Sequence, residues 1–299
     1  MSISAIILTY NESIHIERCI KSLSGIVDTI FIVDSHSNDN TVELFSSFDN
    51  VSYVKKDFVN YSEQFNFALD YFDIKTDWVI RIDADEYIDN DLKYWISENI
   101  HTLPETITGV HVNRYMKFLG KLMKHGGMNE YWVLRMWRNN VGRCEQRWMD
   151  EHIVLEYGDT IKSSGKLIDD NMNNLSWWSH KHVNYSTREA IDILLQEEKC
   201  SSSNQIKSNF FGSSAERIRS LKGAYNKLPL FTRPFLYFIY RYFVRFGFMD
   251  GKEGFLWCIL QGFWYRTLVD AKYYEIHKYA RLQNITVKEF IKKTYGYEI

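Results

Sequence analysis

The first ninety residues repeat one pattern, in which a short apolar run is followed by apolar residues at helical spacing. The run at 4–10, "SAIILTY", precedes Ile16, Cys19, Ile20 and Leu23, which are spaced i, i+3, i+4, i+7. The same order predicts further strands at 29–35, 51–56 and 77–83, and helices from Thr41 and over 62–72. Strands that alternate with helices favour an α/β fold, with a mostly parallel sheet and helices on both faces.

Polar residues gather where three of these strands end. Residues 9–12 follow the first strand, 34–39 follow the second, and 83–86 follow the fourth. Ligands of open α/β sheets bind beyond the carboxyl ends of the strands. The three polar clusters therefore predict one binding site at a single edge of the sheet.

The third cluster, in "WVIRIDADEYID" (78–89), is acidic and follows an apolar strand. In an extended segment, side chains at i and i+2 point to the same side, so Asp83 and Asp85 are expected to converge. A divalent cation would remove their repulsion, which predicts a metal site at Asp83 and Asp85. The competing interpretation is a solvated turn, although Asp89 and Asp91 already suffice to start the next helix. Glu86 is expected to point elsewhere.

The C-terminal third has a different character. Between Lys207 and Arg245 there are eight Lys or Arg and one acid, and "LFTRPFLYFIYRYFVRFGF" (230–248) interleaves aromatic residues with arginine. Three interpretations compete: packed helical core, nucleic-acid surface and membrane surface. Arg233, Arg241 and Arg245 among Phe and Tyr favour the headgroup region of an anionic bilayer, with core packing next. Nothing else in the chain favours nucleic acid.

Composition and cysteine spacing narrow the choice of binding partners and of cellular compartment. The formal net charge is −2, which does not indicate a nucleic-acid-binding protein. Four separated cysteines without a CxxC pair predict buried thiols in a reducing compartment. The N-terminal segment is expected to be a strand rather than a leader, and no stretch approaches 18 uninterrupted apolar residues. We expect a cytoplasmic protein, peripheral on the inner face of a membrane.

Three motifs in order carry a resemblance to a known family. "ILTYNE", "IVDSHSNDNT" and "IRIDADE" resemble the nucleotide-sugar half of family 2 glycosyltransferases, which have the GT-A fold. "MDEHIV", "NNLSWWSHKHVNYSTREA" and "RFGFMDGKEGF" resemble the bacterial branch that builds lipopolysaccharide core and surface polysaccharides. The resemblance implies a GT-A catalytic domain over 1–200, with a nucleotide-sugar half (1–100) and an acceptor half (101–200). The polar, serine-rich stretch at 200–208 would separate it from a helical region at 201–299.

The resemblance also implies the reaction and the roles of residues. The chain would transfer a hexose, glucose or galactose, from a UDP-sugar to a lipid-linked or lipopolysaccharide-core acceptor, with inversion and with Mn²⁺ or Mg²⁺. Asp34 would accept from the uracil ring, Asp83 would lie near the ribose and metal, and Asp85 would ligate the metal. The base and ribose pocket would be lined by Thr9, Tyr10, Asn11 and Glu12. Many relatives carry an arginine near "FNFAL", where this chain has Gln64 and Asn66.

An inverting displacement needs a general base for the acceptor hydroxyl. The candidates in "RWMDEHI" are Asp150 and Glu151. The family's acidic pair places the base at its second member, so Glu151 is preferred. Lys181 and His182, together with neighbouring His180, would reach the diphosphate or the metal, although the tryptophans beside them favour packing.

Two other functions stay open. A sugar-phosphate nucleotidyltransferase shares a similar core, but it needs a glycine-rich basic loop after the first strand, and "TYNESIH" has neither glycine nor Lys or Arg. A non-catalytic protein that binds a nucleotide sugar or glycan at the membrane surface is the second alternative.

Overall fold

The computed structural model describes residues 1–128, 131–145, 151–200 and 225–297. It forms two compact units, Met1–Met172 and Asn173–Ile299, each described by itself below. We expected a boundary near residue 200. The division instead falls after Met172, so the long helix α5 (Leu175–Cys200) belongs to the second unit.

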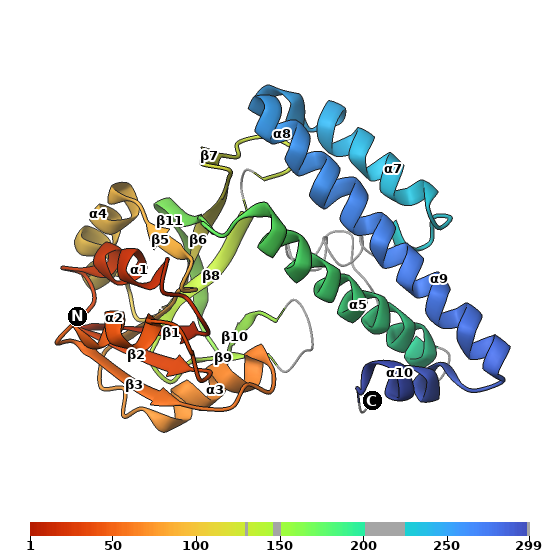
Figure 1. Ribbon diagram of the computed structural model, residues 1–299. Coiled ribbons are helices and arrows are strands. Elements are labelled where there is room, and N and C mark those ends of the chain that lie inside the picture. The colour runs from red at the N-terminus through yellow and green to blue at the C-terminus, as the bar shows by residue number, and fades with distance from the viewer. Residues whose placement is uncertain (129–130, 146–150, 201–224, 298–299) are drawn as a thin grey trace. The chain divides into compact units, whose positions relative to one another are not determined.

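The first unit is built on a nine-stranded mixed sheet. Its strand order is β3-β2-β1-β4-β8-β6-β11-β5, with β7 paired to β6 (Figure 1). A separate pair is formed by β9 and β10. The strands are β1 (Ile3–Thr9), β2 (Thr29–Asp34), β3 (Val51–Lys55), β4 (Trp78–Arg81), β5 (Glu86–Ile88), β6 (Ile107–Phe118), β7 (Lys121–Leu122), β8 (Tyr131–Arg138), β9 (Gly142–Cys144), β10 (Ile153–Leu155) and β11 (Asp159–Asp169).

The pairing confirms a mostly parallel sheet and the four predicted N-terminal strands. β1 runs parallel to β2 and to β4, with Thr9 opposite Asp34 and Ile6 opposite Arg81. β8 runs antiparallel between β4 and β6. Because β1, β2 and β4 are parallel, their carboxyl ends lie at one edge of the sheet. The polar clusters after these three strands therefore share that edge, as predicted.

Helices cover both faces of this sheet, which also confirms the prediction. On one face, α1 (Ile16–Leu23), α2 (Thr41–Ser46) and α4 (Asn90–Asn99) bury Leu23, Phe45 and Ile96 in one apolar cluster that also contains Ile7 and Ile32 of the sheet. On the other face, α3 (Tyr61–Tyr71) packs Phe65 and Ala68 against residues of β1, β4 and β8. Strands buried on both faces read as continuous apolar runs, which explains the sequence pattern.

The second unit is helical. Its elements after α5 are α7 (Thr232–Ile239), the π-helix η2 (Tyr240–Val244), the short 3₁₀ turn η3 (Gly247–Asp250), α8 (Gly251–Trp257), the π-helix η4 (Cys258–Trp264), α9 (Tyr265–Gln283) and α10 (Val287–Tyr295). Ile191 and Leu194 of α5 pack with Ile276 of α9 and Phe290 of α10. These contacts place α5 with the C-terminal helices, since its apolar face is buried there.

Two smaller expectations concern cysteines and membrane spans. Cys19, Cys144 and Cys258 are free thiols and buried, as predicted for these three. Across the part of the chain that is described, no helix combines the length and apolar character that crossing a membrane requires.

Candidate active site

Asp83 lies just beyond the end of β4, surrounded by cationic and hydroxyl groups. Its carboxylate accepts a hydrogen bond from Tyr61 Oη and one from Arg135 Nη2 at 3.1 Å. The Nε atom of Arg81 lies 3.7 Å from Asp83 Oδ1. Burial alone would raise the pKa of Asp83, but the charges of Arg135 and Arg81 outweigh it and hold that pKa well below its usual range. Asp83 is therefore an anion whose charge the protein itself already balances.

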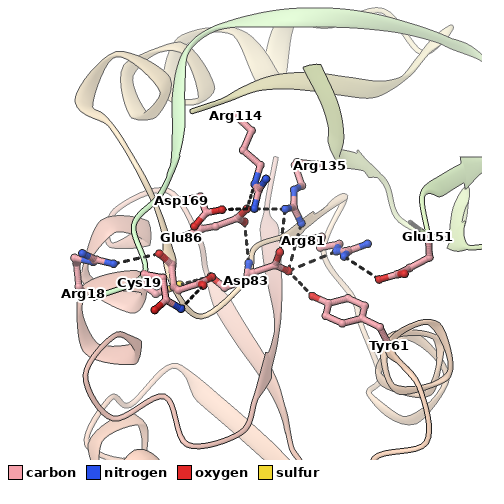
Figure 2. Close-up of polar contacts among 12 residues, drawn as sticks. Arg18, Cys19, Tyr61, Arg81, Asp83, Glu86, Arg114, Arg135, Glu151 and Asp169 are labelled. Carbon is pink, nitrogen blue, oxygen red and sulfur yellow. Dashed lines mark hydrogen bonds and ion pairs between the residues drawn. The ribbon is translucent and has the colours of Figure 1, made fainter. Parts of the chain in front are cut away.

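A second group of charges lies behind Asp83 (Figure 2). Glu86 Oε1 accepts from Arg114 Nε at 2.6 Å and from Arg135 Nη2 at 2.7 Å, and Glu86 Oε2 accepts from the backbone N–H of Asp83 at 3.0 Å. Arg114 also pairs with Asp169. Burial raises the pKa of Glu86, against the opposing charge of Arg135. Since Glu86 is fully buried, it serves this network rather than a ligand.

Asp85 has a different set of neighbours. Its Oδ2 accepts from Asn171 Nδ2 at 3.0 Å, and its backbone carbonyl accepts from Arg18 Nη2 at 3.1 Å. Arg18 also binds Asp170, which ties the Asp85 turn to the segment after β11. Asp83 and Asp85 thus bond to different side chains. Because β4 ends at Arg81 and Asp85 lies in a turn, the alternation of an extended strand does not orient these two carboxylates, and their joint hold on a metal stays a prediction.

Arg81 connects Asp83 to the candidate base. Its Nη2 lies 3.8 Å from Glu151 Oε1, while its Nε faces Asp83. The guanidinium stacks over the rings of Tyr61, at 4.5 Å, and Phe65, at 5.4 Å. Figure 2 shows Arg81 between the two carboxylates. The structure thus brings Glu151 to the acidic cluster. Its neighbour Asp150 lies outside the described residues.

The loop after β2 is organised by Asp34. Its oxygens accept from Thr9 Oγ1 at 2.9 Å, from the Ser37 hydroxyl at 2.5 Å and from the Ser37 N–H at 2.9 Å. Asp34 is 0% exposed, and Thr9 is also buried. A carboxylate that is wholly covered and bonded in this way has no surface to offer a uracil ring in this conformation. In this structure Asp34 therefore supports the loop, and the contact with uracil that the resemblance implied stays a prediction.

The "TYNE" segment presents a polar loop above Asp34. Tyr10 is 58% exposed, in keeping with a side chain that covers a ligand. Asn11 adopts a left-handed backbone (φ 57°), donates its N–H to Ser37 Oγ and accepts from the N–H of Asn38. Glu12 Oε2 lies 2.6 Å from the buried ring of His15. Asn tolerates the left-handed conformation better than most residues, which explains its place in this turn.

The two residues that depart from the family pattern have structural partners. Gln64 is buried, and its Nε2 donates to Ser35 Oγ at 3.1 Å and to the Lys56 carbonyl at 3.0 Å. Asn66 exchanges two hydrogen bonds with the backbone of Cys144. Both amides thus hold neighbouring segments together rather than supplying the positive charge of an arginine.

Lys181 and His182 lie on α5, in the second unit. His182 stacks on Trp178 with ring centroids 3.6 Å apart, and its Nδ1 lies 2.8 Å from the Trp178 carbonyl. Burial lowers the pKa of His182 to about 4, so the ring is neutral at pH 7. Lys181 Nζ lies 4.7 Å from the ring centre of Trp177. These contacts are those of packed side chains, and a role toward a diphosphate stays a prediction.

Several residues of this site were missed in the sequence. Arg81 was visible as the one charge at the end of an apolar strand. Tyr61, Arg114 and Arg135 gave no local signal, because they reach Asp83 and Glu86 only through the packing of α3 and the pairing of β6 and β8. Long-range pairing of this kind leaves no periodic trace in the sequence.

The donor atoms at the strand edge suit a hard divalent cation in part. Among the described residues, no group of three or more His, Cys, Asp or Glu side chains is arranged to hold a metal. Mg²⁺ and similar ions need only one or two carboxylates when substrate phosphates complete the site. Asp85, which faces an amide rather than arginine side chains, fits such a ligand. Asp83, which already bonds to Tyr61 and Arg135, fits a position beside the metal rather than that of its ligand.

Comparison with known proteins places the chain in a family. The sequence model described as "Glycosyl transferase family 2" matches residues 4–151. An uncharacterized glycosyltransferase of Rickettsia bellii (strain RML369-C) is 41% identical over 91 residues, which are 30% of this chain and 30% of that protein. The lipopolysaccharide core biosynthesis glycosyltransferase LpsC of Rhizobium meliloti (strain 1021) is 28% identical over 290 residues, or 95% of this chain and 96% of that protein.

One solved structure is similar to part of the chain. Glucosyl-3-phosphoglycerate synthase from Mycobacterium tuberculosis, in complex with Mn²⁺, UDP and glucosyl-3-phosphoglycerate, matches with a TM-score of 0.31 and 23% identity over 39% of this chain and 44% of that one. The Rickettsia relatives are matched over about a third of their length. The motifs at the carboxyl ends of β1, β2 and β4 lie within residues 4–151, and the sheet has the expected mostly parallel order. The chain therefore carries a glycosyltransferase family 2 domain over residues 4–151, and its first unit has the mixed α/β fold expected of GT-A enzymes.

Proposed function

We propose that this protein is an inverting, metal-dependent hexosyltransferase that uses a UDP-sugar. The acceptor is a lipid-linked or lipopolysaccharide-core glycan, and the protein acts as a peripheral protein on an anionic bacterial membrane. One observation carries the proposal: Arg81 lies between the acidic motif after β4 and the carboxylate of Glu151. Similarity to LpsC along almost the whole chain supports the acceptor class. Glucose and galactose are the expected sugars.

The proposed roles follow the geometry. Tyr10, Asn11 and Glu12 line the base and ribose pocket, with Thr9 and Asp34 supporting it from below. Asp83 faces the ribose and Asp85 holds the metal, with Lys181 and His182 as further candidates toward the diphosphate. Mn²⁺ or Mg²⁺, when bound, would neutralise charge on the diphosphate leaving group.

Glu151 is the proposed base. It takes the proton of the acceptor hydroxyl, whose oxygen forms a bond to the anomeric carbon as the bond from that carbon to the UDP oxygen breaks. A base that acts in one displacement must lie close to the reacting hydroxyl and be held in one orientation. Arg81, whose guanidinium stacks on Tyr61 and Phe65, can hold the Glu151 carboxylate in this way.

The test is release of UDP from a panel of UDP-sugars, with lipid-linked acceptors and with Mn²⁺, Mg²⁺ or chelator. We expect Asp85→Asn to abolish metal-dependent release and Glu151→Gln to lower kcat by about 10²- to 10⁴-fold. Asp91→Asn, at an exposed carboxylate of α4, is the matched control and should leave activity unchanged. Full activity with chelator present would overturn the metal assignment, and full activity of Glu151→Gln would overturn the assignment of the base.

A further inference from the structure

One surface of the second unit gathers exposed apolar side chains from consecutive short elements. We call it the aromatic tip and define it as Phe243, Val244, Phe246, Phe248, Met249 and Phe255, which are 42–60% exposed. Single exposed apolar residues are common on protein surfaces, but a linked group of large ones marks an interaction site. The tip comes from the end of η2, from η3 and from α8.

The rings of the tip form one continuous patch. Tyr242 lies at its centre, with ring centroids 5.0 Å from Phe243, 6.1 Å from Phe248 and 5.6 Å from Phe255. Phe246 reaches Phe248 at 6.0 Å. The exposed aromatic residues are therefore neighbours in space rather than scattered positions.

The backbone under the tip is closely packed. A Cβ atom at Gly254 would lie 2.2 Å from the Gly247 carbonyl oxygen, and one at Gly247 would lie 2.8 Å from Cys258 Sγ. Phe246 itself has a left-handed backbone (φ 57°), which is rare for a bulky residue. Strain of this kind persists only where the surroundings impose it, and it is common at functional sites. Here it keeps a large ring in water.

The fully exposed charges of the tip are positive. Over residues 243–255 the exposed charged residues are Arg245 and Lys252, whereas the acid Glu253 is half-buried and the acid Asp250 is buried. The sequence had suggested Arg233 and Arg241 as headgroup contacts, and this part is wrong, because both are buried. Arg233 forms an ion pair with Asp270. The apolar area and the positive rim belong instead to the stretch that follows Arg241.

We propose that the aromatic tip inserts into the headgroup and upper acyl region of an anionic bilayer. Aromatic side chains favour that depth, and a basic rim adds attraction to anionic lipids. At a symmetric contact between two copies, Arg245 and Lys252 of both copies would meet, with the half-buried Glu253 as the one acid at the surface of the tip, which favours the bilayer as the partner. This membrane contact rests on the proposed function. Because vesicle binding can be measured without sugar transfer, the membrane contact and the proposed transferase activity can each fail alone.

The experiment is cosedimentation of the full chain with vesicles of phosphatidylcholine alone or with about a third phosphatidylglycerol, at low and high salt. We expect binding to the anionic vesicles and an at least tenfold weaker partition for the double variant Phe243→Ser/Phe246→Ser. Arg245→Ala should weaken binding to anionic vesicles several-fold and leave the weak binding to neutral vesicles unchanged.

The matched control is Tyr94→Ser/Tyr157→Ser, which removes two aromatic rings from exposed positions of the first unit. It should bind vesicles as the wild type does. Circular dichroism and UDP release with a soluble acceptor show whether each variant is folded. Equal vesicle binding by the folded Phe243→Ser/Phe246→Ser variant would overturn the proposal. So would a wild-type dimer that the same double variant converts to a monomer without any change in vesicle binding.

Discussion

Replacing Glu86 by Gln should destabilise the first unit strongly, although the two side chains have nearly the same shape. Glu86 is fully buried, and the three groups that face it are donors: Arg114 Nε, Arg135 Nη2 and the N–H of Asp83. An ionised carboxylate only accepts hydrogen bonds, whereas an amide has one acceptor oxygen and an NH₂ group. The glutamine oxygen can face the two guanidinium groups. Its NH₂ group would then meet the Asp83 N–H.

The magnitude follows from these three contacts. Leaving the buried N–H of Asp83 without an acceptor costs about 1–3 kcal/mol. Removing the charge from the two hydrogen bonds to arginine costs about 1 kcal/mol each, because charge-assisted bonds are roughly twice as strong as neutral ones. Glu86→Gln should therefore lower the free energy of unfolding by about 3–5 kcal/mol, the range found when one partner of a buried ion pair is lost.

The assay is urea unfolding, monitored through hydrogen exchange in a peptide that covers residues 78–88. The second unit does not contribute to this signal. With a urea slope of about 2 kcal/mol per M, the midpoint should fall by about 1.5–2.5 M. Glu98→Gln, an exposed change on α4, is the control and should stay within about 0.5 kcal/mol of wild type. A loss below about 1 kcal/mol for Glu86→Gln would refute the argument that this carboxylate balances the buried Arg135 and the half-buried Arg114.

Three further predictions test other parts of the chain. Arg81→Lys keeps the charge but cannot face two carboxylates with one planar group, so kcat for UDP release should fall at least tenfold while circular dichroism stays unchanged. Burial lowers the pKa of His182 to about 4, against about 6.5 in an unfolded chain, so the contribution of the neutral ring to stability is complete above pH 6.5 and is lost as pH falls toward 4. His182→Phe should therefore remove about 2 kcal/mol of the pH dependence of the free energy of unfolding in that window. An unchanged dependence of that free energy on pH would contradict this prediction. Gly165→Ala should lower the free energy of unfolding by more than about 3 kcal/mol in the same assay, because the new Cβ would lie 2.0 Å from Leu92 N. The control Gly120→Ala has the same φ of +81° but open space around the Cβ, and it should lower that free energy by only about 1 kcal/mol.

The sequence was sufficient for features that depend on local pattern. Apolar runs predicted β1, β2, β3 and β4 close to their observed bounds, and the polar residues after β1, β2 and β4 predicted the edge that carries the site. Asp89 was expected to start a helix, and it does cap α4 by accepting from the N–H of Leu92. These features follow from side-chain periodicity and capping chemistry, which act within a few residues.

Other features depended on distant parts of the chain. The boundary after Met172 reflects the packing of α5 on helices that follow it by some 75 residues or more, such as the bond between Glu189 and Tyr265. The exposure of the aromatic tip and the burial of Arg233 and Arg241 were equally hidden, because all of these residues share one aromatic and basic stretch. The composition of a stretch says which residue types are present, but only the packing of the folded chain decides which side chains are exposed.

The same distinction explains the acidic motif itself. Its spacing suggested a pair of carboxylates that needs a cation, and the protein supplies much of that charge from elsewhere: Arg81, Arg114 and Arg135 pair with Asp83, Glu86, Asp169 and Glu151. Burial raises the pKa of Asp169 to about 7, so this carboxyl is only partly ionised at neutral pH, and the three guanidinium groups largely balance the carboxylates of the network. Asp85 stands outside these pairs. Under the proposed function, a divalent cation would therefore be needed beside Asp85, where it would meet the diphosphate, and the arginines would reduce the repulsion between the other carboxylates and an anionic donor.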